Sequence, residues 1–263
     1  MAASGLGLRQ HQATVEAVSD ALPGSRLLVL QTPSLSQAAP GQFVMVRCSS
    51  RLDPYLRQAV PIHRLLADSI GLLVRPDNPD LRWLMQRRPG DHIDLVGPCG
   101  NGFALPHPTD ALAVIVQGGG WTAAAALLDR ANCSVQLLVS AATERQLPPR
   151  ELIPADVEYL GFAGAEQDPR WEGAVAEALS WANRVALAGP AMGGELPALY
   201  PTAISHFRES PAGLRRGRAE AWLWGDIRCG LGCCDTCLVE TSRGRRRICT
   251  DGPVFDLADL AYA

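Results

Sequence analysis

Four cysteines near the C-terminus have a spacing that suits a metal centre. Five of the eight cysteines lie within residues 228–251. Cys229, Cys234, Cys237 and Cys249 follow the pattern C-x4-C-x2-C-x11-C, and the first three have a spacing known for [2Fe–2S] ligands. Such clusters are held by cysteine thiolates, so the segment predicts a [2Fe–2S] cluster with these four ligands.

Spacing alone leaves two other interpretations of this segment open. A zinc site also uses four thiolates, although it usually pairs them in two short C-x2–4-C knuckles. Cys233 offers a second register, C-x3-C-x3-C, in place of Cys234. Disulfides would need an oxidising compartment, and the N-terminus lacks the pattern of a secretory signal.

The residues around the cysteines add two expectations. Gly230 and Gly232 let the backbone curl, so that several N–H groups can point at sulfur atoms. The arginine-rich run at 243–247 lies just before the fourth cysteine. It is either a solvated hairpin or an electropositive rim that steers an acidic partner.

The composition excludes several classes of function. With 263 residues, the chain is long enough for two domains and a small module. A net charge of −3 gives no basic footprint for nucleic acid. No apolar run approaches the roughly 20 residues of a membrane span. We therefore expect a cytoplasmic protein, in which the scattered Cys48, Cys99 and Cys133 are small buried side chains.

The first third reads as an antiparallel β-barrel, which we assign to residues 1–107. Short alternating or apolar segments predict strands at 13–20, 25–32, 42–48, 59–65, 70–75 and 92–96, with a short helix at 79–87. Turn signals such as Pro40-Gly41 separate them. Many short strands at close spacing are typical of a barrel.

The middle third has a different pattern, which we assign to residues 108–218. Apolar strands at 111–117, 134–140, 157–162 and 184–190 alternate with helices. This alternation predicts a doubly wound parallel α/β sheet, in which ligands bind at the carboxyl ends of the strands. Gly118, Gly119 and Gly120 follow the first strand, where a phosphate-bearing ligand can approach the backbone, although three glycines also suit a tight turn. Residues 219–263 then form the small C-terminal iron–sulfur module of this multi-domain chain.

The order of barrel, α/β domain and cysteine module resembles the ferredoxin reductase-like family, specifically the electron transfer subunit of NAD-dependent (class B) dihydroorotate dehydrogenase. The motifs that carry the resemblance are P-G-Q-F-V-M-V (40–46), G-P-C-G-N-G-F (97–103), the glycine run (118–120), A-G-P-A-M (188–192), C-G-L-G-C-C-D-T-C (229–237) and C-T-D-G-P-V-F (249–255). The resemblance implies the register with Cys234 as ligand, since Cys233 falls where the family carries a small residue such as alanine.

The resemblance also implies a function. A nicotinamide cofactor exchanges a hydride with FAD in this subunit. The cluster then relays single electrons between FAD and the flavin of a partner catalytic subunit, in pyrimidine biosynthesis. The chain would be an oxidoreductase subunit of a hetero-oligomer rather than a stand-alone enzyme. The isolated His63, His92, His107 and His206 indicate no catalytic acid or base.

The sequence departs from the family in the flavin motif. The family motif is close to R-R-P-x-S, in which arginine meets the pyrophosphate and serine the isoalloxazine region. Arg57 matches the first arginine, but Gln58, Ala59 and Pro61 stand at the other positions. Proline offers the flavin neither a hydroxyl nor an N–H group. Asp80 and Leu81 replace a Gly-Thr pair, and an aspartate there repels pyrophosphate.

The sequence also departs from the nicotinamide motif, which is close to G-G-G-x-G-x-A-P-L in the family. Trp121, Thr122 and Ala125 change this turn, and Trp121 adds bulk beside it. Three hypotheses follow. The chain is a working FAD- and NAD-linked relay, or an iron–sulfur relay or structural subunit without the NAD site and even without FAD, or a zinc-stabilised interaction module. Related reductase subunits of other complexes share the architecture, so the partner and pathway are open.

Overall fold

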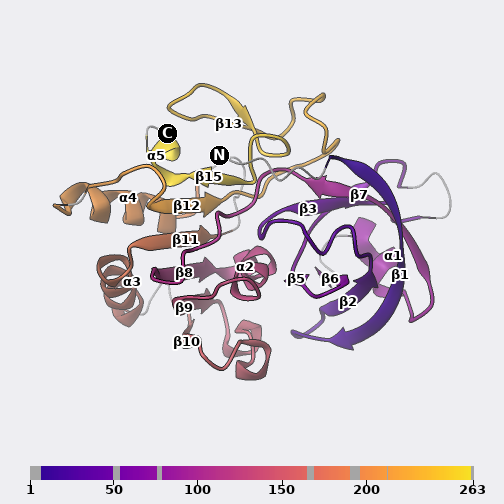
Figure 1. The fold of residues 1–263 in the computed structure, drawn as a ribbon, viewed down its shortest axis with the longest axis horizontal. Coiled ribbons are helices and arrows are strands. Elements are labelled where there is room, and N and C mark those ends of the chain that lie inside the picture. The colour runs from indigo at the N-terminus through magenta and orange to yellow at the C-terminus, as the bar shows by residue number, and fades with distance from the viewer. Residues whose placement is uncertain are drawn as a thin grey trace.

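The computed structural model describes residues 7–49, 54–75, 79–164, 169–189, 196–211 and 213–261. A curled antiparallel sheet lies beside a parallel α/β sheet, and the C-terminal segment runs over both (Figure 1). This is the predicted order of units. Among the described residues, no helix has the length and apolar character needed to cross a bilayer.

The first unit is a seven-stranded antiparallel sheet that curls into a half-barrel. Its order is β4-β3-β7-β1-β2-β6-β5. The strands are β1 (Arg9–Asp20), β2 (Arg26–Gln31), β3 (Phe43–Val46), β4 (Gln58–Pro61), β5 (Arg64–Leu65), β6 (Ser69–Val74) and β7 (His92–Cys99). A 3-10 turn (Pro79–Leu81) and α1 (Arg82–Met85) precede β7. Alternating side chains such as Ala13 and Val15 fill the interior, as period-2 strands predict.

The second unit is a six-stranded sheet with the order β10-β9-β8-β11-β12-β15. Its parallel strands are β8 (Ala111–Gln117), β9 (Ser134–Ala141), β10 (Glu158–Ala163), β11 (Arg184–Ala188) and β12 (Ala219–Trp222), and β15 (Val254–Asp256) is antiparallel to β12. The helices are α2 (Trp121–Leu128), α3 (Pro169–Trp181) and α4 (Leu199–Glu209). Short 3-10 turns lie at Gly118–Gly120, Glu144–Gln146 and Arg150–Leu152.

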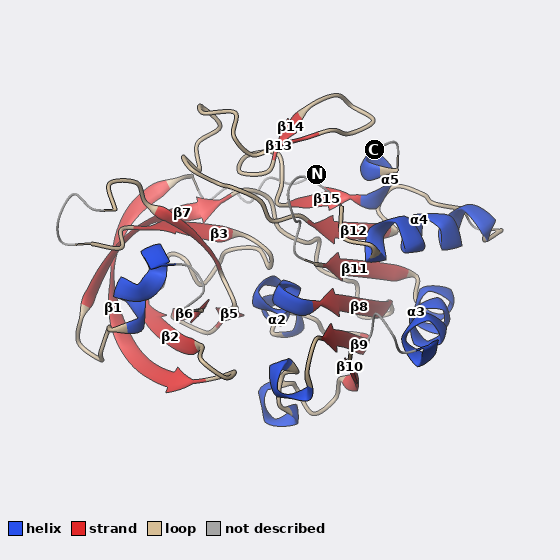
Figure 2. Cartoon of the chain, turned by 180° about the vertical axis from the view of Figure 1, so that it is seen from behind, coloured by secondary structure: helices blue, strands red, loops and turns tan. Residues whose placement is uncertain are grey.

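Both faces of this sheet are covered, as in a doubly wound fold. Along β8, Val114 and Val116 pack with the α2 side of the sheet, whereas Ala113 and Ile115 pack with α3 and α4. Figure 2 shows α2 between the sheet and the half-barrel, with α3 and α4 on the opposite side. Because both faces are buried, the strand reads as a continuous apolar run instead of alternating.

Side chains at the end of α2 and in β12 connect the two units at their junction. Arg64 of the barrel pairs with Asp129 at 2.7 Å, just after α2. The Trp222 indole donates to the carbonyl of Gly41 at 3.1 Å. Trp222 also stacks on Trp224, with ring centroids 5.1 Å apart. The end of β12 is therefore held against the barrel, directly before the chain enters the cysteine segment.

The C-terminal segment is a loop, a hairpin and a return strand. The hairpin pairs β13 (Leu238–Val239) with β14 (Arg246–Arg247), and α5 (Leu257–Leu260) follows β15. Because β12 and β15 belong to the α/β sheet, this segment starts and ends on a rigid support.

Candidate functional site

The cysteine loop has the curled backbone expected from its glycines. Gly230, Gly232 and Asp235 have φ angles of 69°, 76° and 54°, in the left-handed region. The curl turns the Leu231 N–H toward the Cys229 sulfur, at 3.4 Å. Gly230 and Gly232 adopt this conformation without steric cost.

The four predicted ligands come together as two pairs. The Cys229 sulfur accepts a hydrogen bond from the Cys234 thiol, and the Cys249 thiol donates to Cys237. Thr236 Oγ1 donates to the Cys234 sulfur at 3.3 Å. Each iron of a [2Fe–2S] cluster with four cysteines takes two thiolates, so paired cysteines suit that cluster.

The two pairs differ in their electrostatic surroundings. Burial alone would raise the pKa of Cys229, but hydrogen bonds from the backbone N–H groups of Leu231, Cys233 and Cys234, with that of the Cys234 thiol, lower the pKa to about 6. Burial, together with the adjacent Cys237, raises the pKa of Cys249 to about 12. N–H groups that favour a thiolate at Cys229 are also suited to a thiolate bound to iron.

The structure also bears on whether the side chains are grouped around a single metal ion. Among the described residues, no three His, Cys, Asp or Glu side chains are grouped so that they could hold one metal ion. A structural zinc site needs four ligands around one ion.

Cys233 is exposed and lies beside the first pair. Its thiol donates a hydrogen bond to Cys229, which is the main reason that the pKa of Cys233 is raised. Both Cys233 and Cys234 thus reach Cys229, and the choice between them rests on the register of the resemblance. Of the scattered cysteines, Cys48 and Cys99 are buried as expected, whereas Cys133 is half-buried.

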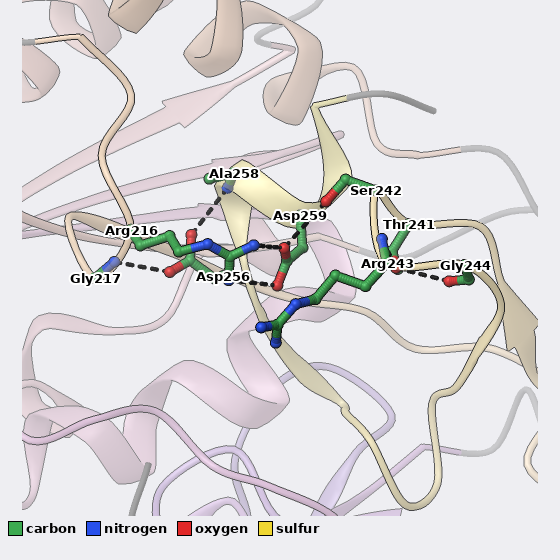
Figure 3. A network of polar contacts seen from close by, with 9 residues as sticks. All are labelled: Arg216, Gly217, Thr241, Ser242, Arg243, Gly244, Asp256, Ala258 and Asp259. Atoms are coloured by element: carbon green, nitrogen blue, oxygen red, sulfur yellow. Dashed lines mark hydrogen bonds and ion pairs between the residues drawn. The ribbon is translucent and has the colours of Figure 1, made fainter.

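The hairpin brings Cys249 to the loop. The Ile248 N–H donates to the carbonyl of Cys237 at 2.9 Å, which extends the hairpin pairing to the cysteines themselves. The far end of the hairpin is fixed to α5, where Ser242 Oγ donates to Asp259 at 3.1 Å (Figure 3). Asp259 also pairs with Arg216, and its carbonyl accepts the Ser242 N–H at 2.8 Å.

The arginine-rich run forms part of this hairpin. Arg245 pairs with Glu240 at 2.6 Å, and Arg247 pairs with Asp235 at 2.6 Å. Local acids thus neutralise two of the arginines, which favours the solvated hairpin over an electropositive rim.

The cysteine loop lies against the barrel strand β3. A Cβ atom at Gly230 would lie 2.6 Å from Met45 Cγ and 2.8 Å from Met45 Sδ. Met45 is opposite Ala59 of β4, in the segment of the predicted flavin motif. The loop and the flavin-type strand are therefore separated by one packed methionine.

Arg57, the predicted pyrophosphate ligand, is bound within the protein. Its guanidinium donates to both carboxylate oxygens of Asp94, at 2.9 and 2.8 Å, and to the Asp94 carbonyl at 3.1 Å. Gln10 also donates to this carboxylate, at 3.0 Å. These bonds occupy three of the five N–H donors of Arg57, so the side chain keeps capacity for a phosphate. Pro61 lies in β4 opposite Phe43, and Asp80 lies in the 3-10 turn before α1.

The predicted glycine run is a 3-10 turn between β8 and α2. A Cβ atom at Gly120 would lie 2.2 Å from the carbonyl oxygen of Ala188, so close backbone packing requires this glycine. Gly118 and Gly119 face open space, and Gly118 has a φ angle of 49°. Two of the three glycines thus leave room for a ligand, and the third is explained by packing. Residues 190–192 of the A-G-P-A-M motif lie outside the described residues.

Trp121 points into the junction of the two units. Its side chain is buried, and its ring lies edge-on to His63 of the barrel, with centroids 5.7 Å apart. His63 is itself buried and donates from Nδ1 to the Thr122 carbonyl at 3.2 Å. The bulk of Trp121 is therefore directed into the protein.

Comparison with known proteins matches this organisation. Residues 226–261 match the family model for the iron–sulfur cluster binding domain of dihydroorotate dehydrogenase B. The resemblance predicted from the sequence is confirmed. The chain is 29% identical to the dihydroorotate dehydrogenase B (NAD(+)) electron transfer subunit of Desulforamulus reducens, over 92% of this chain and 95% of that protein. The probable subunit of Thermoplasma acidophilum is 27% identical, over 95% and 90% of the two chains.

Solved structures support the fold. A chain of an NADH-dependent reduced ferredoxin–NADP oxidoreductase superposes with a TM-score of 0.72 at 18% identity, over 94% of this chain and 88% of that one. A ferredoxin–NADP+ reductase from Neisseria gonorrhoeae gives 0.61 at 15% identity, over 81% and 98%. The predicted ferredoxin reductase-like architecture is therefore confirmed.

Sequence reasoning missed several residues beside this cysteine site. Met45 and Asn101 lie within quoted motifs, but the sequence gives them no role because their partners are more than 140 residues away. Asp94 carries a weak signal as a carboxylate within a predicted strand. Only the pairing of β7 with β3 shows that it faces Arg57.

Proposed function

We propose that this chain is the electron transfer subunit of a dihydroorotate dehydrogenase B-type complex. It relays electrons between a nicotinamide cofactor, FAD and a [2Fe–2S] cluster, to or from a partner flavoprotein. The observation that carries the proposal is the pairing of Cys229 with Cys234 and of Cys237 with Cys249 in a loop packed on the flavin-type barrel. We assign those cysteines as the ligands.

The cluster supplies one-electron transfer when bound, which links the two-electron chemistry of nicotinamide and flavins to a partner. The chain positions it by aiming backbone N–H groups at the first thiolate pair and by delivering Cys249 on a hairpin. Hydrogen bonds to cluster sulfurs and solvent exposure both set its reduction potential.

The barrel residues fit FAD in part. Arg57 has donors left for a pyrophosphate and is shared with Asp94, while Pro61 contributes no polar group. Gly118 and Gly119 provide the open turn at which a nicotinamide cofactor would approach the backbone. We assign Arg57 to flavin and residues 118–120 to the nicotinamide side, within units 1–107, 108–218 and 219–263.

The exposed tip of the cysteine loop is the proposed face for the partner subunit. Leu231 lies between the two left-handed glycines and is 56% exposed, beside the first cysteine pair. An exposed leucine at the edge of a redox centre suits a contact that brings a second cofactor close. All eight cysteines are free thiols, which agrees with function in the reducing cytoplasm.

A second candidate is an iron–sulfur relay or structural subunit without the nicotinamide site and even without FAD. Two observations favour it: Gly120 is explained by its packing on Ala188, and Asp94 occupies much of Arg57. One experiment separates the two functions from a zinc-bound module. It is the ultraviolet–visible spectrum of the purified protein, with flavin extraction and metal analysis on the same sample.

Flavin and cluster bands that are bleached by NADH support the full relay. Iron without flavin supports the second candidate. A colourless protein with about one zinc per chain contradicts both.

A further inference from the structure

The turn that ends the barrel is in contact with the segment that carries the fourth cysteine. The Asn101 side-chain amide donates to the carbonyl oxygen of Asp251 at 2.9 Å and to that of Thr250 at 3.4 Å. The Asn101 backbone N–H donates to the Gly252 carbonyl, and its own carbonyl accepts the Val254 N–H at 3.4 Å. One residue of the barrel thus binds backbone groups of four residues of the C-terminal segment, Thr250, Asp251, Gly252 and Val254.

The turn itself is fixed, so it can act as a support. Gln42 donates to the carbonyl of Gly100, directly before Asn101. A Cβ atom at Gly100 would lie 2.4 Å from the Gly252 carbonyl oxygen, and one at Gly102 would lie 2.4 Å from that of Pro40. The turn is therefore in close backbone contact with the C-terminal segment at Gly100 and with the barrel unit at Gly102.

The hairpin also holds the supported segment next to the cysteine, since the N–H groups of Thr250, Asp251 and Gly252 all donate to the Arg247 carbonyl, at 3.3, 2.8 and 3.2 Å. Thr250 and Asp251 directly follow Cys249. On the hairpin side, the Arg247 N–H donates to the Asp251 carboxylate at 2.8 Å, and the Ile248 N–H reaches the Cys237 carbonyl. On the barrel side, the amide of Asn101 is what holds the Thr250 and Asp251 carbonyls.

We infer that Asn101 is a positioning residue for the Cys249 ligand, so that the barrel sets the geometry of one iron of the cluster. The inference rests on the proposed [2Fe–2S] cluster. Without the amide, the backbone after Cys249 loses the two hydrogen bonds that its carbonyls accept from the barrel, and it gains freedom to move. The Cys237–Cys249 pair then holds its iron less firmly, while the Cys229–Cys234 pair keeps its surroundings.

The test compares Asn101→Ala and Asn101→Asp with a matched control, Asn183→Ala. Asn183 also bridges two segments through its amide, to Ala111 and Asp110, but it lies at the start of β11 in the α/β unit. Each full-length holoprotein is assayed for the rate of iron transfer to a chelator. The electron paramagnetic resonance spectrum of the reduced cluster is recorded for each. Thermal melting of the metal-free proteins shows whether each variant folds.

We expect both Asn101 variants to release iron about tenfold faster, the change that about 1.4 kcal/mol gives, with altered g-values. The control should keep the wild-type rate and spectrum. Asn101→Asp preserves side-chain size, removes the donor and adds a negative charge that repels the two carbonyl oxygens, so it remains informative if Asn101→Ala folds poorly. Wild-type rates and spectra in folded Asn101 variants overturn the inference. A wild-type protein that binds no iron overturns the proposed function as well, which distinguishes the two failures.

Discussion

The cysteine loop and the flavin-type strand β4 lie on either side of Met45, yet their polar groups are in opposite states. In the loop, backbone N–H groups point at sulfur atoms, and the cysteines are already paired. In the barrel, the one charged residue of the flavin motif is bound to Asp94. The loop already points its N–H groups at the cysteine sulfurs, whereas Arg57 would have to share its N–H donors between Asp94 and a flavin.

The largest effect is expected at the ligands. Cys234→Ser should abolish or strongly change the visible spectrum of the cluster, because serine oxygen is a poor substitute for thiolate at iron. Cys233→Ala is the matched control and should leave the spectrum unchanged. If Cys234→Ser keeps the spectrum and Cys233→Ala loses it, the second ligand is Cys233.

Gly230→Ala tests the contact between the loop and the barrel. A non-glycine residue at positive φ costs about 1–2 kcal/mol, and the overlap with Met45 adds about 1–3 kcal/mol of overpacking. Gly244→Ala is the control, since Gly244 also has positive φ but no atom near its Cβ position. Urea unfolding should show a larger loss of stability for Gly230→Ala. Equal losses would mean that the loop does not pack on β3.

His63 tests how the nicotinamide-side helix is attached to the barrel. Burial lowers the pKa of His63 from 6.5 to about 4, so the folded protein keeps it neutral. Below pH 6.5 His63 is protonated in the unfolded chain but stays neutral in the folded protein. The free energy of unfolding therefore falls as the pH drops from 6.5 to 4. The loss is about 3 kcal/mol at pH 4.

Urea unfolding at pH 7 and pH 4 measures this loss, and His63→Gln should remove that part of the pH dependence. His92→Gln, at an exposed position, should retain it. The same pH dependence in the wild type and in His63→Gln would contradict the role of His63.

Asp94→Asn is expected to give the smallest effect and addresses the flavin side directly. Removing the carboxylate frees Arg57 for pyrophosphate, so FAD should bind a few-fold more tightly, worth about 1 kcal/mol or less for this partly exposed pair. Asp91→Asn, which alters another arginine pair of the barrel, is the control. Titration of flavin-free protein with FAD measures both. Weaker binding in Asp94→Asn would show that Asp94 orients Arg57 for the flavin.

The sequence by itself determined the order of units and the faces of the strands, and it predicted the cysteine register. Strands that alternate apolar and polar residues have one buried face, and continuously apolar strands have two. The short spacing of the cysteines reflects a single local loop. These features depend on neighbouring residues, so they can be read along the chain. Three of the four predicted ligands, Cys229, Cys234 and Cys237, are also close together in the chain.

Only the tertiary structure decided which distant residues meet. Arg57 faces Asp94 because β7 pairs with β3, and Gly230 must be glycine because Met45 lies over it. Gly120 is needed for packing on Ala188 as well as for any ligand. Asn101 reaches the backbone next to Cys249 across 150 residues. Such contacts depend on how sheets pack and cross, and no local pattern in the chain specifies them.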